Sequence, residues 1–327
     1  MHRWRGGVGN NQRIIITFNT TLLNTTPYYS TVTPPYTTLH HPIQPYTARS
    51  ATTQPYTIMK KILTILALAI SAMTMMAQER YGKLYYIVVR NQGSYSASVV
   101  HHEKYKKLQS IAIPDYITYK GNTAPVIDIS EFAFHKCFSL TSITIPNSVT
   151  EIGDNAFYDC SALTSISIPR NVTTIGMQAF SNCSSLTSIT IPRNVTTIGE
   201  RAFFNCSSLT NIVVEEGNTH YDSRNHCNAI IETATNALII GCPNTIIPNS
   251  VTEINELAFF GCDALTSITI PHSVTTIQYR AFEACTSLKT IIFDGTMEEW
   301  QAVEKGNLWH FRTPATHVQC TDGEVEL

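Results

Sequence analysis

The strongest constraint on the fold is a proline that recurs every 23 residues, with one longer interval of 56 residues. The recurring residues are Pro146, Pro169, Pro192, Pro248 and Pro271. Around each of them the same apolar frame repeats, and in one copy this frame contains Val172, Ile175 and Phe180. Self-similarity at this period indicates a solenoid, in which each repeat buries its apolar edge against its neighbours. We therefore expect a stack of coils rather than a domain built around one central core.

A single repeat predicts the path of one coil. Residues 163–168 alternate apolar and hydroxyl side chains, which indicates a strand with isoleucines inward and serines outward. Pro169 lacks an N–H group and ends that strand, Gly176 permits a tight turn, and the Ala-Phe pair begins a short helical or 3₁₀ return. Stacked strands lie ~4.8 Å apart, so one side of the coils should form a continuous parallel sheet. The predicted fold is a β-rich solenoid, a right-handed superhelix with short helical or 3₁₀ returns.

The repeat frame divides the chain into five segments. They are a disordered or wrongly assigned N-terminal extension (1–58), a signal peptide (59–77), a β-rich N-terminal cap (79–122), the solenoid (123–293) and a C-terminal cap and tail (294–327). Within the solenoid, an irregular coil at 215–247 exceeds a regular one by ten residues and contains a hairpin signal near Ala234-Thr235. Caps are expected because the terminal coils of a solenoid would otherwise expose their apolar ends.

Residues 59–77 have the order of a secretory signal peptide. The basic pair Lys60-Lys61 precedes an apolar run over 62–70, and small residues then lead to a cleavage point after Ala77. The apolar run is too short to span ~30 Å of hydrocarbon comfortably, so no transmembrane span should remain after cleavage. We therefore expect a secreted or cell-surface protein, located outside the cytoplasm.

The distribution of charge excludes one class of partner. Every acidic residue lies at Glu79 or beyond, and residues 1–78 carry only basic charges, so the net charge of −2 conceals a more acidic mature part. No basic stripe marks a nucleic-acid surface. Nucleic acid is therefore not an expected partner.

The repeat also resembles a known family. The pattern Leu-x-x-Ile-x-Ile-Pro-x-x-Val-Thr-x-Ile-Gly-x-x-Ala-Phe-x-x-Cys, which extends over 123–293, is similar to the BspA-like leucine-rich repeat. The irregular coil and the run from Gly295 through Trp300 and Trp309 to Cys320 resemble variant segments of such proteins. The resemblance implies a bacterial protein that is secreted or displayed on the cell surface and takes part in adhesion to host or microbial surfaces.

The repeated cysteines occupy one position of the coil. The ladder consists of Cys137, Cys160, Cys183, Cys206, Cys262 and Cys285. Disulfides are the alternative in a secreted protein, but the repeated position favours buried free thiols with a packing role. A second repeated set fills the interior of the stack: Phe157, Phe180, Phe203, Phe259 and Phe282.

Two further cysteines fall within the hairpin of the irregular coil. A turn near Ala234-Thr235 would place Ile231 opposite Leu238 and Ile230 opposite Ile239, which brings Cys227 opposite Cys242. Opposed Cβ atoms lie close enough for a disulfide after a modest adjustment. Both the bridged and the free states remain open from the sequence.

The candidate ligand surface combines the outward positions of the predicted sheet with two other sets. The sheet positions are Ser142, Thr144, Ser165, Ser167, Ser188, Thr190, Asn211, Ser267 and Thr269. Arg170 and Arg193 form a rim, and the irregular coil adds Tyr221, Arg224 and His226 because insertions in repeats map to loops. The simpler interpretation is that Ser and Thr merely keep a strand surface soluble.

The sequence contains little that indicates a catalytic site or a metal site. The chain has no nucleophile-elbow, phosphate-loop or zinc-protease motif. His220, Asp222, His226 and Cys227 are suitable zinc ligands, but their spacing fits no compact motif. We expect a non-enzymatic monomer without cofactors or metal that binds a protein or glycan ligand, with a structural spacer of the cell envelope as the alternative.

Overall fold

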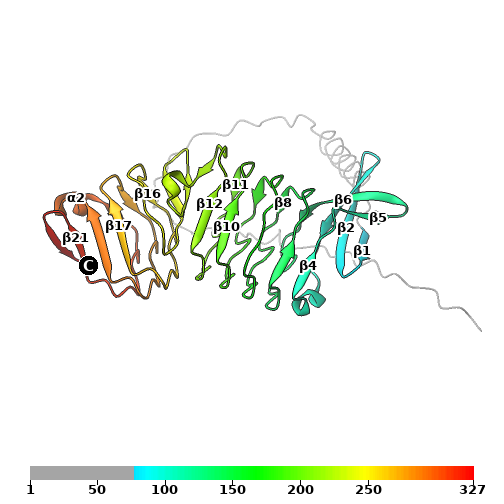
Figure 1. The fold of residues 1–327 in the computed structure, drawn as a ribbon, viewed down its shortest axis with the longest axis horizontal. Coiled ribbons are helices and arrows are strands. Elements are labelled where there is room, and N and C mark those ends of the chain that lie inside the picture. Colours follow the sequence, from blue (N-terminus) through cyan, green and yellow to red (C-terminus); the bar gives the residue numbers. More distant parts are fainter. Residues whose placement is uncertain (1–76) are drawn as a thin grey trace, which may run out of the picture. The chain divides into compact units, whose positions relative to one another are not determined.

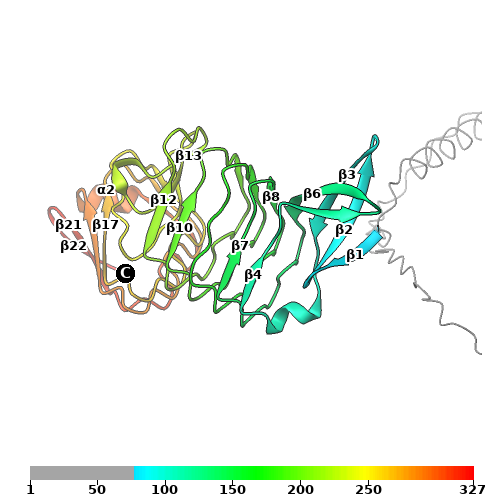
Figure 2. The same ribbon diagram turned by 45° about the vertical axis from the view of Figure 1, so that its right-hand side comes forward.

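The computed structural model describes residues 77–327, which belong to one compact unit of the chain. The predictions for the extension at 1–58 and for the signal peptide up to residue 76 lie outside these residues. Figures 1 and 2 show coils that follow one another in chain order from β1 to β22. The fold is a strand-rich leucine-rich-repeat solenoid with parallel sheets, as the repeat predicts.

The N-terminal segment is rich in strands and already contains part of the solenoid. Its elements are β1 (Ala77–Tyr81), β2 (Leu84–Asn91), β3 (Ser94–Val99), the 3₁₀ helix η1 (Glu103–Lys107), β4 (Ser110–Ala112), β5 (Tyr116–Tyr119) and β6 (Asn122–Ile129). β4 pairs in parallel with β7 (Ser142–Thr144), with Ser110 opposite Ser142. The expected boundary of the cap at residue 122 is therefore too late, because the hairpin β5–β6 separates Pro114 from Pro146 and hides one repeat from the 23-residue count.

The first sheet carries the alternating strands of the repeat, but it is not continuous. Its members are β4, β7, β10 (Ser188–Ile191), β12 (Asn211–Val214), β17 (Ser267–Pro271), β19 (Thr290–Asp294), β21 (His317–Cys320) and β22 (Gly323–Glu326). They form three separate sheets, β4–β7, β10–β12 and β17–β19–β21–β22. One break falls in the coil 146–168, which forms no strand at Ile166 or Ile168. The other falls at the irregular coil.

A second parallel ladder, absent from our prediction, runs along another side of the coils. It consists of two-residue strands from the Thr-x-Ile part of the repeat: β8 (Glu151–Ile152), β9 (Thr174–Ile175), β11 (Thr197–Ile198), β16 (Glu253–Ile254), β18 (Thr276–Ile277) and β20 (Glu304–Lys305). β6, β8, β9 and β11 form one run, and β16, β18 and β20 form another. The isoleucines of these strands are buried except Ile198, which is half-buried, and β20 has Lys305 at this position. The ladder therefore closes the core on this side.

The Ala-Phe returns form a third ladder. Within a return, Ala179 N–H donates to Gly176 O at 3.3 Å, the three-residue span of a 3₁₀ turn. The next N–H group, that of Phe180, donates instead to Ala202 O of the following coil at 2.8 Å. A positive φ at Gln178 (52°) prevents a continuous helix. The expected helical returns are therefore series of turns whose alternate N–H groups bind the next coil.

The interior of the stack is a column of aromatic rings. Phe157 and Phe180 are stacked with ring centroids 5.2 Å apart, Phe180 and Phe203 are 5.3 Å apart, and Phe259 and Phe282 are 4.8 Å apart. The column stops at the irregular coil, where the buried apolar residues divide into two clusters.

The irregular coil contains β13 (Tyr221–Asp222), the 3₁₀ helix η2 (Arg224–His226), β14 (Ile230–Glu232) and β15 (Ala237–Ile240). At the C-terminal end, α2 (Met297–Ala302) begins with a capping box between Thr296 and Glu299 and buries Trp300. The helix ends at Ala302, and the following residues Glu304–Lys305 form β20. Within residues 77–327, no helix is both long and apolar enough to cross a membrane.

Candidate binding surface

The ladder cysteines are buried free thiols that bind the preceding coil. The Sγ atoms of Cys160, Cys183 and Cys285 donate to the carbonyls of Phe134, Phe157 and Phe259 at 3.1, 3.2 and 3.0 Å. Burial raises the pKa of the Cys206 thiol to about 12. These groups therefore remain protonated and join coils, and they offer no nucleophile to a ligand.

Cys227 and Cys242 are also free thiols. The register of the hairpin explains why they do not meet. Ile231 lies opposite Leu238 as expected, but a bulge shifts Ile230 to a position opposite Ile240 and not Ile239. Cys227 then packs in the second apolar cluster and Cys242 in the first, so the disulfide alternative is not formed.

The predicted outward positions, which are eight hydroxyl side chains and Asn211, lie along the side of the coils that carries the first sheet. All nine are exposed except Ser188, which is half-buried. Within the described residues, the single side-chain hydrogen bond among the nine joins Ser142 to Ser110 at 3.1 Å. The remaining hydroxyls are therefore free to bind a ligand.

A different set of threonines, next to these positions, uses its hydroxyls inside the protein. Thr187 Oγ1 donates to Thr164 O at 3.3 Å, and Thr196 Oγ1 donates to Thr173 O at 3.3 Å, each to the coil before it. Two rows of such bonds run along the stack. The repeat thus contains two classes of hydroxyl: one ties coils together and the other faces solvent.

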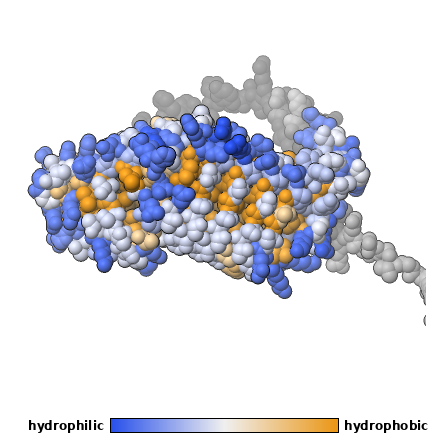
Figure 3. All heavy atoms as spheres, in the orientation of Figure 1, coloured by the Kyte–Doolittle hydropathy of each residue, from blue (hydrophilic) through white to orange (hydrophobic). Residues whose placement is uncertain are grey.

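The sheet face also contains two residues that are not among the predicted positions. Asn244 and Ile246 stand four and two positions before Pro248, where the regular coils place their outward hydroxyls. Ile246 is 74% exposed, and Val213 on β12 is 40% exposed. Their distance from Pro248 is the sequence signal that identifies them, and the ten extra residues of the irregular coil lie before this segment. Figure 3 shows an apolar stripe along the stack between hydrophilic margins.

The two rim arginines share one acid. Arg170 Nε lies 3.7 Å from Glu215 Oε1, and Arg193 Nε lies 3.8 Å from Glu215 Oε2. Both arginines remain more than half exposed. These long, solvated contacts contribute little to stability, so both guanidinium groups stay available at the edge of the sheet face.

Two of the three residues proposed in the irregular coil are structural. Tyr221 is buried, and its hydroxyl accepts a hydrogen bond from Ile198 N–H at 3.0 Å. The Arg224 guanidinium donates to both carboxylate oxygens of Asp222 and to Asn236. Both side chains are therefore held by bonds inside the protein, although both also line a hollow beside β12.

His226 is exposed, in the left-handed region with φ 54°, and it lines a hollow of about 560 Å³. That hollow lies between β12 and residues 215–228.

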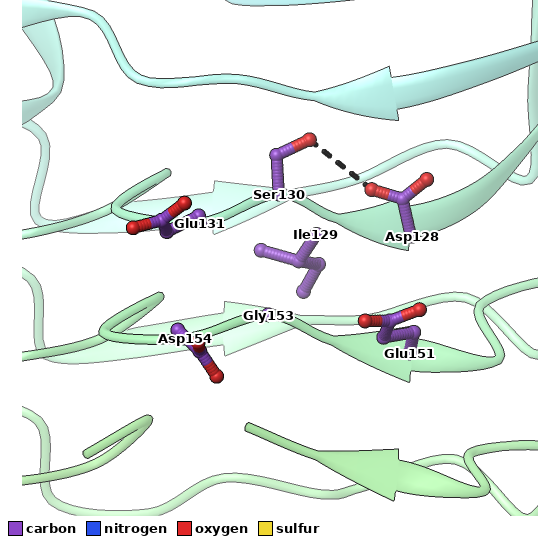
Figure 4. Close-up of a pocket in the computed structure, with 7 residues that line it drawn as sticks. All are labelled: Asp128, Ile129, Ser130, Glu131, Glu151, Gly153 and Asp154. Carbon is purple, nitrogen blue, oxygen red and sulfur yellow. Dashed lines mark hydrogen bonds between the residues drawn. The ribbon is translucent and has the colours of Figure 1, made fainter. Parts of the chain in front are cut away.

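A second hollow, of about 370 Å³, is lined by carboxylates of two adjacent coils. Figure 4 shows Asp128, Glu131, Glu151 and Asp154 around it, with Asp128 bound to Ser130. Burial raises the pKa of the Asp128 carboxyl, against the effect of its hydrogen bonds from Ser98 and Ser130. Among residues 77–327, no group of three or more His, Cys, Asp or Glu side chains could hold a metal ion. The zinc ligands considered in the irregular coil therefore form no such cluster.

Three of the solved structures that are similar to this chain are leucine-rich repeat proteins. A leucine-rich repeat protein from Bacteroides ovatus is 22% identical over 75% of this chain and 76% of its own, with a TM-score of 0.46. The T. pallidum leucine-rich repeat protein is 24% identical over 70% and 86%, with a TM-score of 0.42. A leucine-rich cell surface protein from Faecalibacterium prausnitzii is 22% identical over 70% and 97%, with a TM-score of 0.30. A search of curated proteins returns no match.

The family comparison covers more than half of the chain. Residues 127–237 and 239–304 match the family described as BspA type leucine rich repeat region, with six copies. This match spans the regular coils, the irregular coil and the beginning of the C-terminal segment. The chain therefore belongs to the BspA-type leucine-rich repeat family.

Proposed function

We propose that this chain is a non-enzymatic binding protein, secreted or held at the cell surface, that adheres to a protein or glycan ligand through its first sheet. The observation that supports this most is the row of outward hydroxyls without partners inside the protein, such as Ser167, Thr190 and Thr269. A ligand can bind these groups without breaking any bond of the fold. Membership of a repeat family implicated in adhesion agrees with this function.

The composition of the face suggests how it discriminates among ligands. Hydroxyls alone would bind many polar partners with similar affinity. Val213 and Ile246 place exposed apolar side chains in the middle of the row, and the two rim arginines add positive charge at one edge. Apolar contacts between polar groups are typical of surfaces that bind proteins. A protein ligand is therefore favoured over a purely hydrophilic glycan.

The direct test uses the mature chain from Gln78, immobilised and exposed to a panel of host matrix proteins and glycans. Once a ligand is found, Thr190→Glu on β10 should weaken binding, because it places a charge in the hydroxyl row. Thr197→Glu changes the same residue type on β11, which belongs to the other ladder, and should leave binding unchanged. If no member of the panel binds, that result favours the alternative, a structural spacer of the cell envelope.

A further inference from the structure

The three ladders that join the coils all stop at the same place. Within the described chain, no backbone-to-backbone hydrogen bond connects residues 77–214, the first stack, with residues 216–327, the second stack. Among the described strands of the first sheet, β12 is the last strand of the first stack and pairs only with β10. In the second ladder, β11 is the last strand of the run that begins with β6. The irregular coil belongs to the second stack by its backbone, since β15 pairs with β16 and Gly241 N–H donates to Ala258 O.

Side chains replace the missing backbone bonds at this contact, which we call the seam. Ile212 N–H donates to Asn228 Oδ1 at 3.2 Å, and Val214 N–H donates to Ser223 Oγ at 3.0 Å. On the second side of the coils, Ile198 N–H donates to the Tyr221 hydroxyl. Each of these donors would bind a carbonyl of the next coil in the regular repeat. The seam therefore satisfies the donors of the last regular coil without forming a ladder.

The third side of the seam is bridged by two pairs of side chains. Phe204 stacks on Phe260 with ring centroids 4.3 Å apart, and Arg201 pairs with Glu256 at 2.7 Å. These residues come from coils on either side of the irregular coil, because the irregular coil lacks an Ala-Phe return. Both charged groups are about half exposed, so the ion pair adds little to the strength of the contact.

The apolar core divides at the seam too. The hairpin β14–β15 sends Ile230 into the first cluster and Ile231 into the second. Cys242 lies fully buried in the first cluster although its backbone belongs to the second stack. The hollow lined by His226 and Val213 lies along the same line.

We propose that the molecule opens at this seam as two rigid stacks, with the segment Glu215–Asn218 as the hinge. Opening breaks no backbone ladder bond. It breaks side-chain bonds, which include Asn218 Nδ2 to the carbonyls of Pro192 and Val195 and Asn244 Nδ2 to Thr210 O. It also separates the Phe204–Phe260 stack and exposes Ile230 and Cys242 of the first cluster. Gly217 lies in the hinge with φ 89°, and no atom lies within 4 Å of the position that a Cβ would occupy there. A ligand that contacts both stacks would hold the seam closed.

The test is thiol labelling of the unmodified mature chain under native conditions, with mass spectrometry to report each cysteine separately. Cys242 becomes accessible when the seam opens, whereas Cys160, equally buried inside the first stack, needs that stack to unfold. We expect Cys242 to react at least about tenfold faster than Cys160, since local opening costs less than global unfolding. Labelling in denaturant corrects for intrinsic reactivity.

Matched variants separate seam opening from general loosening. Phe204→Ala should raise the labelling rate of Cys242 several-fold and leave that of Cys160 unchanged. Tyr158→Ala removes the aromatic ring at the same position of a coil inside the first stack and should not accelerate Cys242. Equal native rates for Cys242 and Cys160, or acceleration of both thiols by Phe204→Ala, would overturn the proposal.

Hydrogen exchange tests whether the opening involves the whole seam or the hairpin alone. Amides of Ile212 and Val214, which donate to side chains, should exchange faster than those of Ile189 and Ile191, their ladder partners in β10. Equal protection of the two pairs would show that the hairpin frays while the seam stays closed, which contradicts the proposal.

Discussion

The regular coils and the irregular coil are bonded to the preceding coil in different ways. Regular coils bind their neighbours mainly through backbone groups, and identical residues such as Phe157 and Phe180 stack on one another. In the irregular coil, specific side chains such as Asn228 and Tyr221 meet the donors of the preceding coil. A ladder tolerates substitution because the backbone supplies its bonds, whereas the seam depends on the identity of a few residues.

The largest expected effect concerns the regular stack. Phe180 is fully buried between Phe157 and Phe203, so Phe180→Ala should lower the free energy of unfolding by about 3–5 kcal/mol. Denaturant titration of the mature chain measures this. Because coils couple to their nearest neighbours, hydrogen exchange should show protection lost first around this coil, and uniform loss that reaches β2 would contradict local coupling.

At the seam, one hydroxyl tests the role of side-chain identity. Tyr221→Phe leaves Ile198 N–H without an acceptor in a half-buried place and should cost about 1–3 kcal/mol of unfolding free energy. Tyr116→Phe is the control, because Tyr116 is exposed, and it should change stability by less than about 0.5 kcal/mol. Equal effects of the two substitutions would mean that the seam does not rely on this bond.

The two classes of threonine give a finer comparison. Thr173 Oγ1 donates to Thr150 O at 3.3 Å, so Thr173→Val should cost about 0.5–1 kcal/mol. Thr190→Val on the sheet face breaks no internal bond and should leave thermal stability nearly unchanged while it weakens binding to any ligand of the face. A loss of stability from Thr190→Val would show that the face hydroxyls serve the fold.

The smallest effect depends on pH. Burial raises the pKa of Asp128 in the folded protein. Stability therefore falls as the pH rises from the unfolded pKa of about 4 through the folded pKa, and protonation removes this cost as the pH falls. Asp128→Asn should therefore raise the melting temperature at neutral pH, and the gain should shrink towards about pH 4. Glu131→Gln, at an exposed carboxylate of the same hollow, should have almost no effect. A gain for Asp128→Asn that is independent of pH would contradict the electrostatic explanation.

Much of the solenoid could be predicted because each coil repeats the same local pattern. The period, the inward isoleucines, the buried Phe column and the packing role of the cysteines all depend on contacts between identical positions one repeat apart. The first repeat was not recognised because the β5–β6 hairpin displaces Pro114 from the 23-residue count. The predicted helical or 3₁₀ returns are 3₁₀-type turns and not continuous helices, because alternate N–H groups bind the next coil. Whether these N–H groups bond within the return or to the next coil depends on the neighbouring coil and not on local helix propensity.

The candidate binding surface also contains residues that the sequence predicts and residues that only the structure identifies. By itself the sequence determined which residues alternate along the strands, and hence that Ser167 and Thr190 point outward. Only the tertiary structure decided that Tyr221 and Arg224 are consumed by internal bonds, that Ile246 joins the face, and that Cys227 and Cys242 lie in different cores. The physical reason is that repeated positions see the same neighbours in every coil, while residues of the irregular coil meet partners that no period specifies.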